Sequence, residues 1–96
     1  MYIAIVHDIH DADAFQARAR NDVFPLPEGL HVHHFFPATD QGEAVCLYEA
    51  PSVAAVRDHL DPSLGDSSTQ RYFPVAEDHA MGLPAGQVPA QQADPG

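Results

Sequence analysis

The amino-acid sequence predicts an α+β domain in which strands and helices follow the order β-α-β-β-α-β. Residues 31–37 show the two-residue period of a strand most clearly, and residues 2–10 are typical of a strand that is apolar on both faces. Two further segments follow a capping residue and repeat apolar side chains at helical spacing. Stretches with Gly, Pro and Asp separate them, as expected for turns.

The first predicted strand covers residues 2–10, and both of its faces are apolar over most of their length. One face carries Ile3, Ile5, His7 and Ile9, and the other carries Tyr2, Ala4, Val6 and Asp8. Such a strand is typical of a sheet that is covered on both sides. Polar residues interrupt the segment and no basic region precedes it, so we expect neither a signal peptide nor a membrane span.

The first helix is expected to begin after a cap at Asp11 or Asp13, because a carboxylate accepts from the free amides of the first turn. Its buried stripe is Phe15, Ala19 and Val23, and the prolines that follow end the helix.

The second helix is expected to begin after Ser52 as N-cap. Val53, Val56 and Leu60 form its buried stripe, and Asp61-Pro62 is predicted to end it.

Residues 31–49 are expected to form a hairpin around a polar turn. If residues whose numbers sum to about 81 are opposite each other, Phe35 lies beside Cys46 and His33 beside Tyr48.

A last strand is predicted at residues 70–76, with Pro74 suited to a sheet edge. The folded domain then spans residues 1–82. Residues 83–96 are rich in Pro, Gln and Ala and are expected to be a disordered tail.

This order of elements is the ferredoxin-like arrangement, in which both helices lie on one face of an antiparallel sheet. The other face is predicted to be apolar as well, formed by Tyr2, Ala4 and Val6 with Phe35, Cys46 and Tyr48. An exposed patch of that size is unusual on a soluble monomer. We therefore predict a homodimer of the dimeric α+β barrel type, with two sheets packed face to face and a small cleft enclosed.

Charge and cysteine content narrow the range of partners and compartments. The formal charge is −10, with 14 acidic residues against four arginines and no lysine. Phosphate is repelled by such a protein, so nucleic acid and anionic membranes are not expected partners, whereas cations are. Cys46 is the only cysteine, which excludes an intramolecular disulfide and suits a reducing cytoplasm.

The segment from His33 to Pro51 resembles a family of small bacterial ferredoxin-like proteins of largely unknown function, one branch of which is dimeric and binds nickel. The matching positions are His33, Phe35, Asp40, Cys46, Tyr48, Glu49, Ala50 and Pro51. Arg57 and His59 fit the helix that follows, and residues 72–75 fit the final strand more loosely. His31 and His34 depart from the family pattern, which has an aromatic residue and a serine there. The resemblance implies nickel for that branch and transfers only His33 as a candidate ligand.

The pair His31-x-His33 is the sharpest candidate for a metal site, because side chains two apart on a strand point the same way. Imidazole suits Ni²⁺, Zn²⁺ and Cu²⁺. Two ligands make a weak site, so a third or fourth donor is expected from His7, His59, His10 or His79, or from the copies of these residues in a second subunit. The alternative is a half-exposed histidine pair with no ion, and for His59 a structural role at the helix C-terminus.

Three classes of function remain open from the sequence. The first is a homodimeric protein that is metal-binding or metal-responsive. The second is a cofactor-independent dimeric α+β barrel enzyme of monooxygenase or isomerase type, with His33 or His7 as general base, Asp8 orienting it and Tyr48 donating to an oxyanion. The third is a binding or regulatory module. Cys46 is interpreted as a small buried apolar residue rather than a nucleophile.

Overall fold

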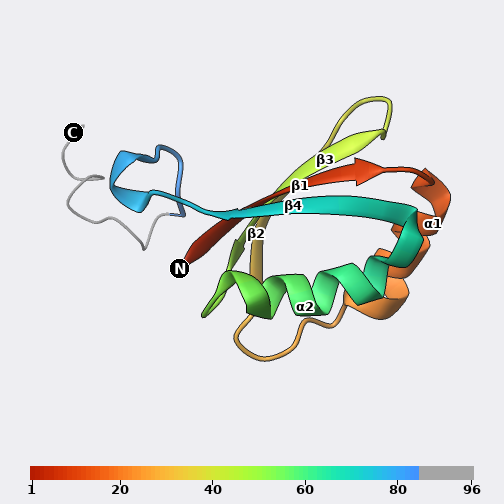
Figure 1. Cartoon of the computed structure of the whole chain (residues 1–96). Coiled ribbons are helices and arrows are strands. Elements are labelled where there is room, and N and C mark those ends of the chain that lie inside the picture. The colour runs from red at the N-terminus through yellow and green to blue at the C-terminus, as the bar shows by residue number, and fades with distance from the viewer. Residues whose placement is uncertain (85–96) are drawn as a thin grey trace.

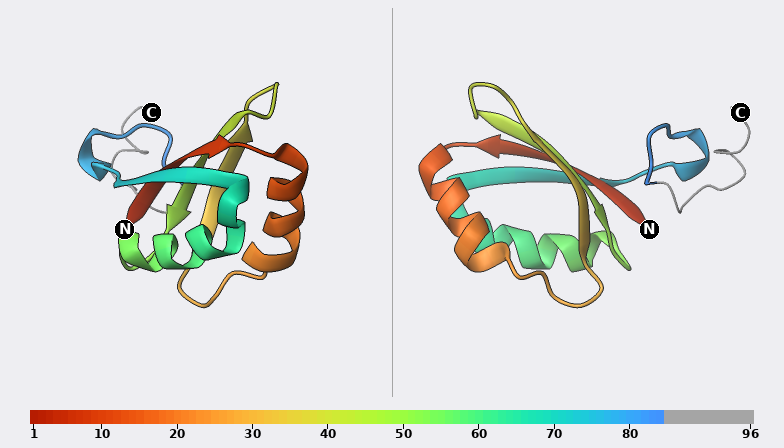
Figure 2. Two further views of the ribbon diagram at one scale, coloured as in Figure 1. Left: turned by 45° about the vertical axis from the view of Figure 1, so that its right-hand side comes forward. Right: turned by 180° about the vertical axis from the view of Figure 1, so that it is seen from behind.

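Four antiparallel strands form one sheet, and both helices lie against the same face of it (Figure 1). The computed structural model describes residues 1–84. The elements are β1 (Tyr2–Ile9), α1 (Ala12–Arg18), the π-helical turn η1 (Ala19–Val23), β2 (His31–Pro37), β3 (Glu43–Glu49), α2 (Val53–Leu64) and β4 (Ser68–Pro74). The strand order is β2-β3-β1-β4, and Figure 2 shows the helices on the same side of the sheet from two further directions. The predicted ferredoxin-like fold is confirmed.

Both helices begin where the capping residues indicate. The Asp11 side chain accepts from the backbone N–H of Ala14 at 3.1 Å, and the Ser52 hydroxyl accepts from that of Ala55 at 3.1 Å. Each contact satisfies one of the free amides of a first helical turn. The sequence signals for helix starts are therefore confirmed.

The predicted end of the second helix at Asp61-Pro62 is wrong, because α2 continues to Leu64 with Pro62 inside it. Proline lacks the N–H of one helical hydrogen bond and strains the preceding turn. The extra turn buries Leu64 to 2% exposure in the core, which offsets that loss. Gly65 then ends the helix with φ at +57°, a conformation that favours glycine.

The hairpin register is confirmed at one end and wrong at the other. Phe35 lies opposite Cys46, as expected. A bulge between Val32 and His34 then shifts the register, so that Val32 rather than His33 faces Tyr48. An inserted residue of this kind bends the strand locally and has no clear signal in a single sequence.

The assignment of the hairpin residues to the uncovered face is also wrong. In the pairing of β1 with β3, Ile3 lies opposite Tyr48 and Ile5 opposite Cys46. Directly opposed residues share a face, so Cys46 and Tyr48 lie under the helices, and Phe35 follows because it pairs with Cys46.

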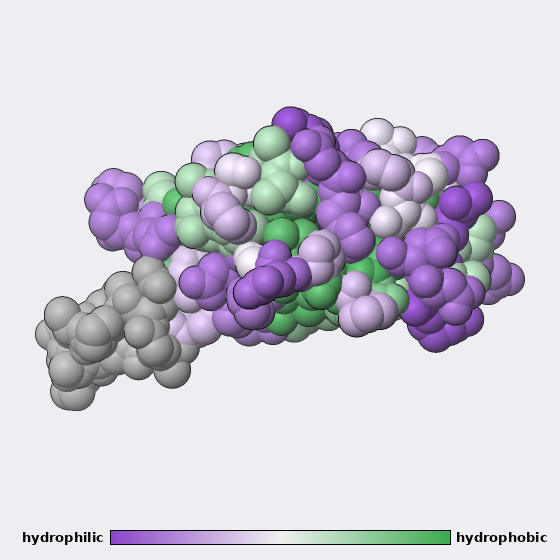
Figure 3. All heavy atoms as spheres, turned by 90° about the horizontal axis from the view of Figure 1, so that it is seen from below, coloured by the Kyte–Doolittle hydropathy of each residue, from purple (hydrophilic) through white to green (hydrophobic). Residues whose placement is uncertain are grey.

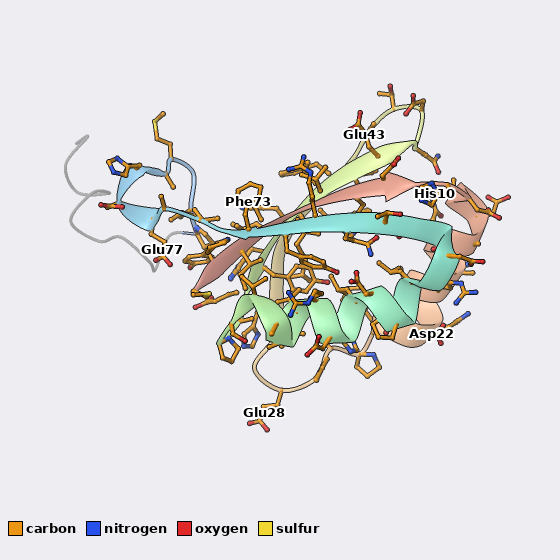
Figure 4. All side chains as sticks on the ribbon, viewed as in Figure 1. His10, Asp22, Glu28, Glu43, Phe73 and Glu77 are labelled. Atoms are coloured by element: carbon orange, nitrogen blue, oxygen red, sulfur yellow. The ribbon has the colours of Figure 1, made fainter. Side chains whose placement is uncertain are left out.

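We call the side of the sheet under the helices the covered face and the other side the open face. The covered face supplies the strand residues of the core, which comprises Ile3, Ile5, Phe15, Val23, Leu30, Cys46, Tyr48, Ala50, Val56, Leu60 and Leu64. The open face carries Ala4 and Val6 from β1, Val45 and Leu47 from β3, His34 and Phe36 from β2, and Phe73 from β4. Phe73 points away from the helices in Figure 4.

Pro74 lies on the edge strand β4, as predicted, but it ends the strand two residues before the predicted end at residue 76. The strand begins at Ser68, two residues before its predicted start. The predicted tail at residues 83–96 lies outside the described residues from position 85 onward. Among residues 1–84, neither helix has the length and apolar character needed to cross a membrane.

Candidate functional site

A cavity of about 170 Å³ lies between the covered face and the helices, and we call it the His7 cavity. Its walls are formed by His7, Phe15, Ala19, Val23, Phe24, Val32, Phe35, Cys46, Tyr48, Leu60 and Leu64. All but three of these side chains are hydrocarbon. Phe24 and Phe35 are partly exposed, at 44% and 46%. Seen from below in Figure 3, hydrophobic residues lie between hydrophilic ones in the middle of this side of the molecule.

His7 is the buried histidine of the cavity wall, with 2% of its surface exposed. The alternation of β1 places it on the covered face beside Ile5. The ring of Phe15 packs edge-on against the imidazole, with the two ring centroids 5.4 Å apart. Its Nε2 lies 3.2 Å from Cys46 Sγ, and its Nδ1 lies 3.1 Å from Gln70 Oε1. Both ring nitrogens therefore have a polar partner, as a buried imidazole requires.

A chain of hydrogen bonds continues from His7 to the molecular surface. The Gln70 amide nitrogen donates to Asp61 Oδ1 at 2.9 Å, and the Tyr72 hydroxyl donates to the same oxygen at 2.6 Å. The Ser68 hydroxyl donates to Gln70 Oε1. This network joins β1, β4 and α2 at one side of the cavity.

Burial keeps the cavity groups uncharged. Burial lowers the pKa of His7, against the opposing effects of the Gln70 hydrogen bond and the Asp61 charge. Burial raises the pKa of the Cys46 thiol to about 12 and raises that of the Tyr48 phenol. At neutral pH the cavity thus holds a neutral imidazole, which can accept a proton. It also holds a protonated thiol and a protonated phenol, which can donate hydrogen bonds.

The four predicted metal ligands lie in three separate places. His7 is on the covered face. His59 on α2 donates from Nε2 to the backbone carbonyl of Val23 at 2.9 Å, which ties α2 to η1. His31 and His33 belong to the edge strand β2, far along the sheet from the His7 network. The structure does not bring the four side chains together.

The two histidines of β2 lie near one carboxylate. His33 Nε2 is 2.9 Å from Glu49 Oε1, and His31 is the cross-strand neighbour of Glu49. Within residues 1–84, no group of three or more His, Cys, Asp or Glu side chains is arranged to hold a metal ion. Nickel, zinc or copper binding stays a prediction.

The residues that surround His7 were missed in the sequence, except for Tyr48. Asp8 was expected to orient the imidazole, but it is exposed, and its place in the alternation of β1 puts it on the open face. Gln70 makes that contact instead, because β4 pairs with β1 and sets Gln70 directly opposite His7. Strand pairing between residues 63 apart leaves no local signal.

Comparisons of the chain with protein family models, with curated proteins and with solved structures found no match.

Proposed function

We propose that this protein is a cofactor-independent enzyme of the dimeric α+β barrel type that binds a small neutral molecule in the His7 cavity and uses His7 as general base. The observation that carries the proposal is the position of His7, which is buried, neutral and on the wall of an apolar cavity. A well-formed apolar pocket with a few polar groups and a perturbed pKa is the usual setting of a small-molecule site.

The cavity defines the size and polarity of the substrate. Its volume of about 170 Å³ is close to that of an apolar cavity engineered into a different protein, which has about 150 Å³ and binds benzene. A charged ligand would lose its hydration without gaining a counter-charge from the hydrocarbon walls. The substrate is therefore a neutral molecule of about one ring.

The reaction that these groups support is abstraction of a proton from the carbon beside a carbonyl, which gives an enolate, as in an isomerase. His7 accepts the proton at Nε2, where the substrate replaces the weak S–H donor of Cys46. Tyr48 lines the same cavity, and its raised pKa keeps the phenol protonated as a donor for the developing oxyanion.

Exchange of the α-protons of cyclopentanone in D₂O, followed by NMR, tests the proposal. Saturable exchange is expected with wild-type protein, and His7→Gln is expected to reduce it by roughly 10²–10⁴-fold with ligand binding retained. His10→Gln is the matched control, because His10 is the exposed histidine just after the same strand. Absence of binding by neutral ring compounds, or equal activity of His7→Gln, would contradict the proposal.

The homodimer is proposed to form through the open face, with a second copy of this chain as the occupant. Phe36, Val45 and Phe73 are 61%, 46% and 45% exposed there. Val6 and Leu47 extend the same apolar surface between them. A twofold interface needs one self-complementary patch, and this face supplies hydrophobic residues from all four strands.

Sedimentation velocity of Phe36→Asp tests the dimer. A charge within the proposed interface is expected to weaken dimerisation by at least about 100-fold, because several kcal/mol are needed to bury an unpaired carboxylate. Met81→Asp is the control, since Met81 is 91% exposed and lies outside the sheet. A wild-type monomer at micromolar concentration would refute the interface.

Metal binding by His31 and His33 is a second proposal, supported by their shared proximity to Glu49. A dimer through the open face would add the donors of a second copy. Native mass spectrometry with Ni²⁺, Zn²⁺ or Cu²⁺ is expected to give a defined stoichiometry that the His31→Ala/His33→Ala variant loses. Uptake that is unchanged in this variant would remove the proposed ligands.

A further inference from the structure

The side chain of Gln70 is the hydrogen-bond partner of His7 Nδ1, so it bears on which nitrogen of His7 carries the proton. Its side-chain oxygen lies 3.1 Å from His7 Nδ1, and its side-chain nitrogen lies 2.9 Å from Asp61 Oδ1. An amide offers an acceptor at one end and donors at the other, so its orientation determines the hydrogen that His7 must present.

Asp61 fixes the orientation of that amide. A carboxylate only accepts hydrogen bonds, so the amide nitrogen of Gln70 must face it. Turning the amide over would set two oxygens against each other at Asp61 and would remove the acceptor from the Ser68 hydroxyl. Tyr72 holds the carboxylate in place through its own donated hydrogen bond, and burial together with the Asp61 charge raises the pKa of its phenol.

The consequence is one tautomer of His7. With the Gln70 oxygen as acceptor, the neutral imidazole carries its hydrogen on Nδ1 and keeps the lone pair of Nε2 for the cavity side, toward Cys46. Free histidine in water favours the other tautomer, with the hydrogen on Nε2. A histidine that must accept a proton at Nε2 therefore needs a hydrogen-bond acceptor at Nδ1 to stabilise the Nδ1–H tautomer.

We propose that Gln70 and Asp61 are positioning residues that hold His7 as the Nδ1–H tautomer, so that Nε2 is the proton acceptor on the cavity wall. The catalytic use of this arrangement rests on the proposed function. The tautomer itself is a property of the ligand-free protein and is measured without a substrate.

Long-range ¹H–¹⁵N NMR of ¹⁵N-histidine-labelled protein in mildly alkaline buffer tests the inference, with the His7 signals assigned by their loss in His7→Gln. Wild-type protein is expected to show a protonated Nδ1 and an unprotonated Nε2. Gln70→Leu removes the acceptor and is expected to shift His7 to a predominantly Nε2–H tautomer. Asp61→Asn allows Gln70 to turn over and is expected to give a mixture of both.

Asp58→Asn is the matched control, because Asp58 is an exposed carboxylate on the same helix that pairs with Arg57, and it is expected to leave the wild-type pattern. An Nε2–H tautomer in wild-type protein would overturn the inference, and so would an unchanged Nδ1–H tautomer in both Gln70→Leu and Asp61→Asn. Asp61→Asn preserves side-chain shape, so it answers the question even if Gln70→Leu fails to fold. If the tautomer is confirmed but no neutral ring compound binds, the inference about the tautomer stands and the proposed function is refuted.

Discussion

The two faces of the sheet are built from the same strands and from similarly apolar residues, yet their environments differ sharply. On the covered face Ile3 and Ile5 have no exposed surface, whereas on the open face Phe36 is 61% exposed. Hydrophobicity along the strand therefore does not decide burial, because burial depends on which face receives the two helices. The difference teaches that one side of this sheet forms the core and a wall of the His7 cavity, whereas the other side leaves large apolar side chains exposed.

The histidines on the two faces show the same contrast. His7 on the covered face is 2% exposed and has two side-chain partners. His33 lies on the open face, where its ring centroid is 5.5 Å from that of Tyr2, and it contacts Glu49 on β3; the His33 and Glu49 side chains are 27% and 42% exposed. A hydrogen bond in the low-dielectric interior is stronger than one at the surface. Leaving a buried polar group without its partner therefore costs more free energy than leaving an exposed group without one.

Truncation of one residue from each face should give the largest difference. Ile5→Ala is expected to lower the free energy of unfolding by about 3 kcal/mol, because it opens a void in the core. Val45→Ala on the open face is expected to change it by less than about 0.5 kcal/mol. Urea unfolding in a Phe36→Asp background, which excludes any dimer contribution, measures both. Equal costs would mean that the open face is also packed.

The pH dependence of stability should report on His7. Since burial lowers the pKa of His7 below its ordinary value of 6.5, the unfolded chain binds more protons than the folded one below that pH. The contribution of His7 is thus complete above pH 6.5 and declines as pH falls, by at most about 1.4 kcal/mol per pH unit. Denaturant titrations of wild type and His7→Gln should diverge on acidification. Parallel curves would show that His7 titrates normally.

The smallest effect is expected for the open-face histidine. His33→Gln removes a partly exposed polar contact between the imidazole and the Glu49 carboxylate, and such surface contacts contribute about 0–1 kcal/mol. Thermal unfolding at neutral pH should therefore change little. A loss as large as that of Ile5→Ala would show that the pair is buried in the molecule as it exists in solution, as a dimer through this face would require.

The sequence by itself determined the kinds and order of the elements. The caps Asp11 and Ser52, the strands at residues 31–37 and 43–49, and the contact of Phe35 with Cys46 were all predicted, since each depends on residues close in the chain. The ferredoxin-like order followed from them. These features depend on local propensity, periodicity and turn chemistry, which a single chain displays directly.

Only the tertiary structure decided which side chains meet. The meeting of His7 with Cys46 and Gln70, the burial of Cys46 and Tyr48 under the helices, and the separation of His7 from His31 and His33 depend on pairing between distant strands and on one bulge. A shift by one residue between two strands moves every side chain to the other face. Local pattern cannot specify that choice, which is made by the joint packing of the sheet and both helices around one core.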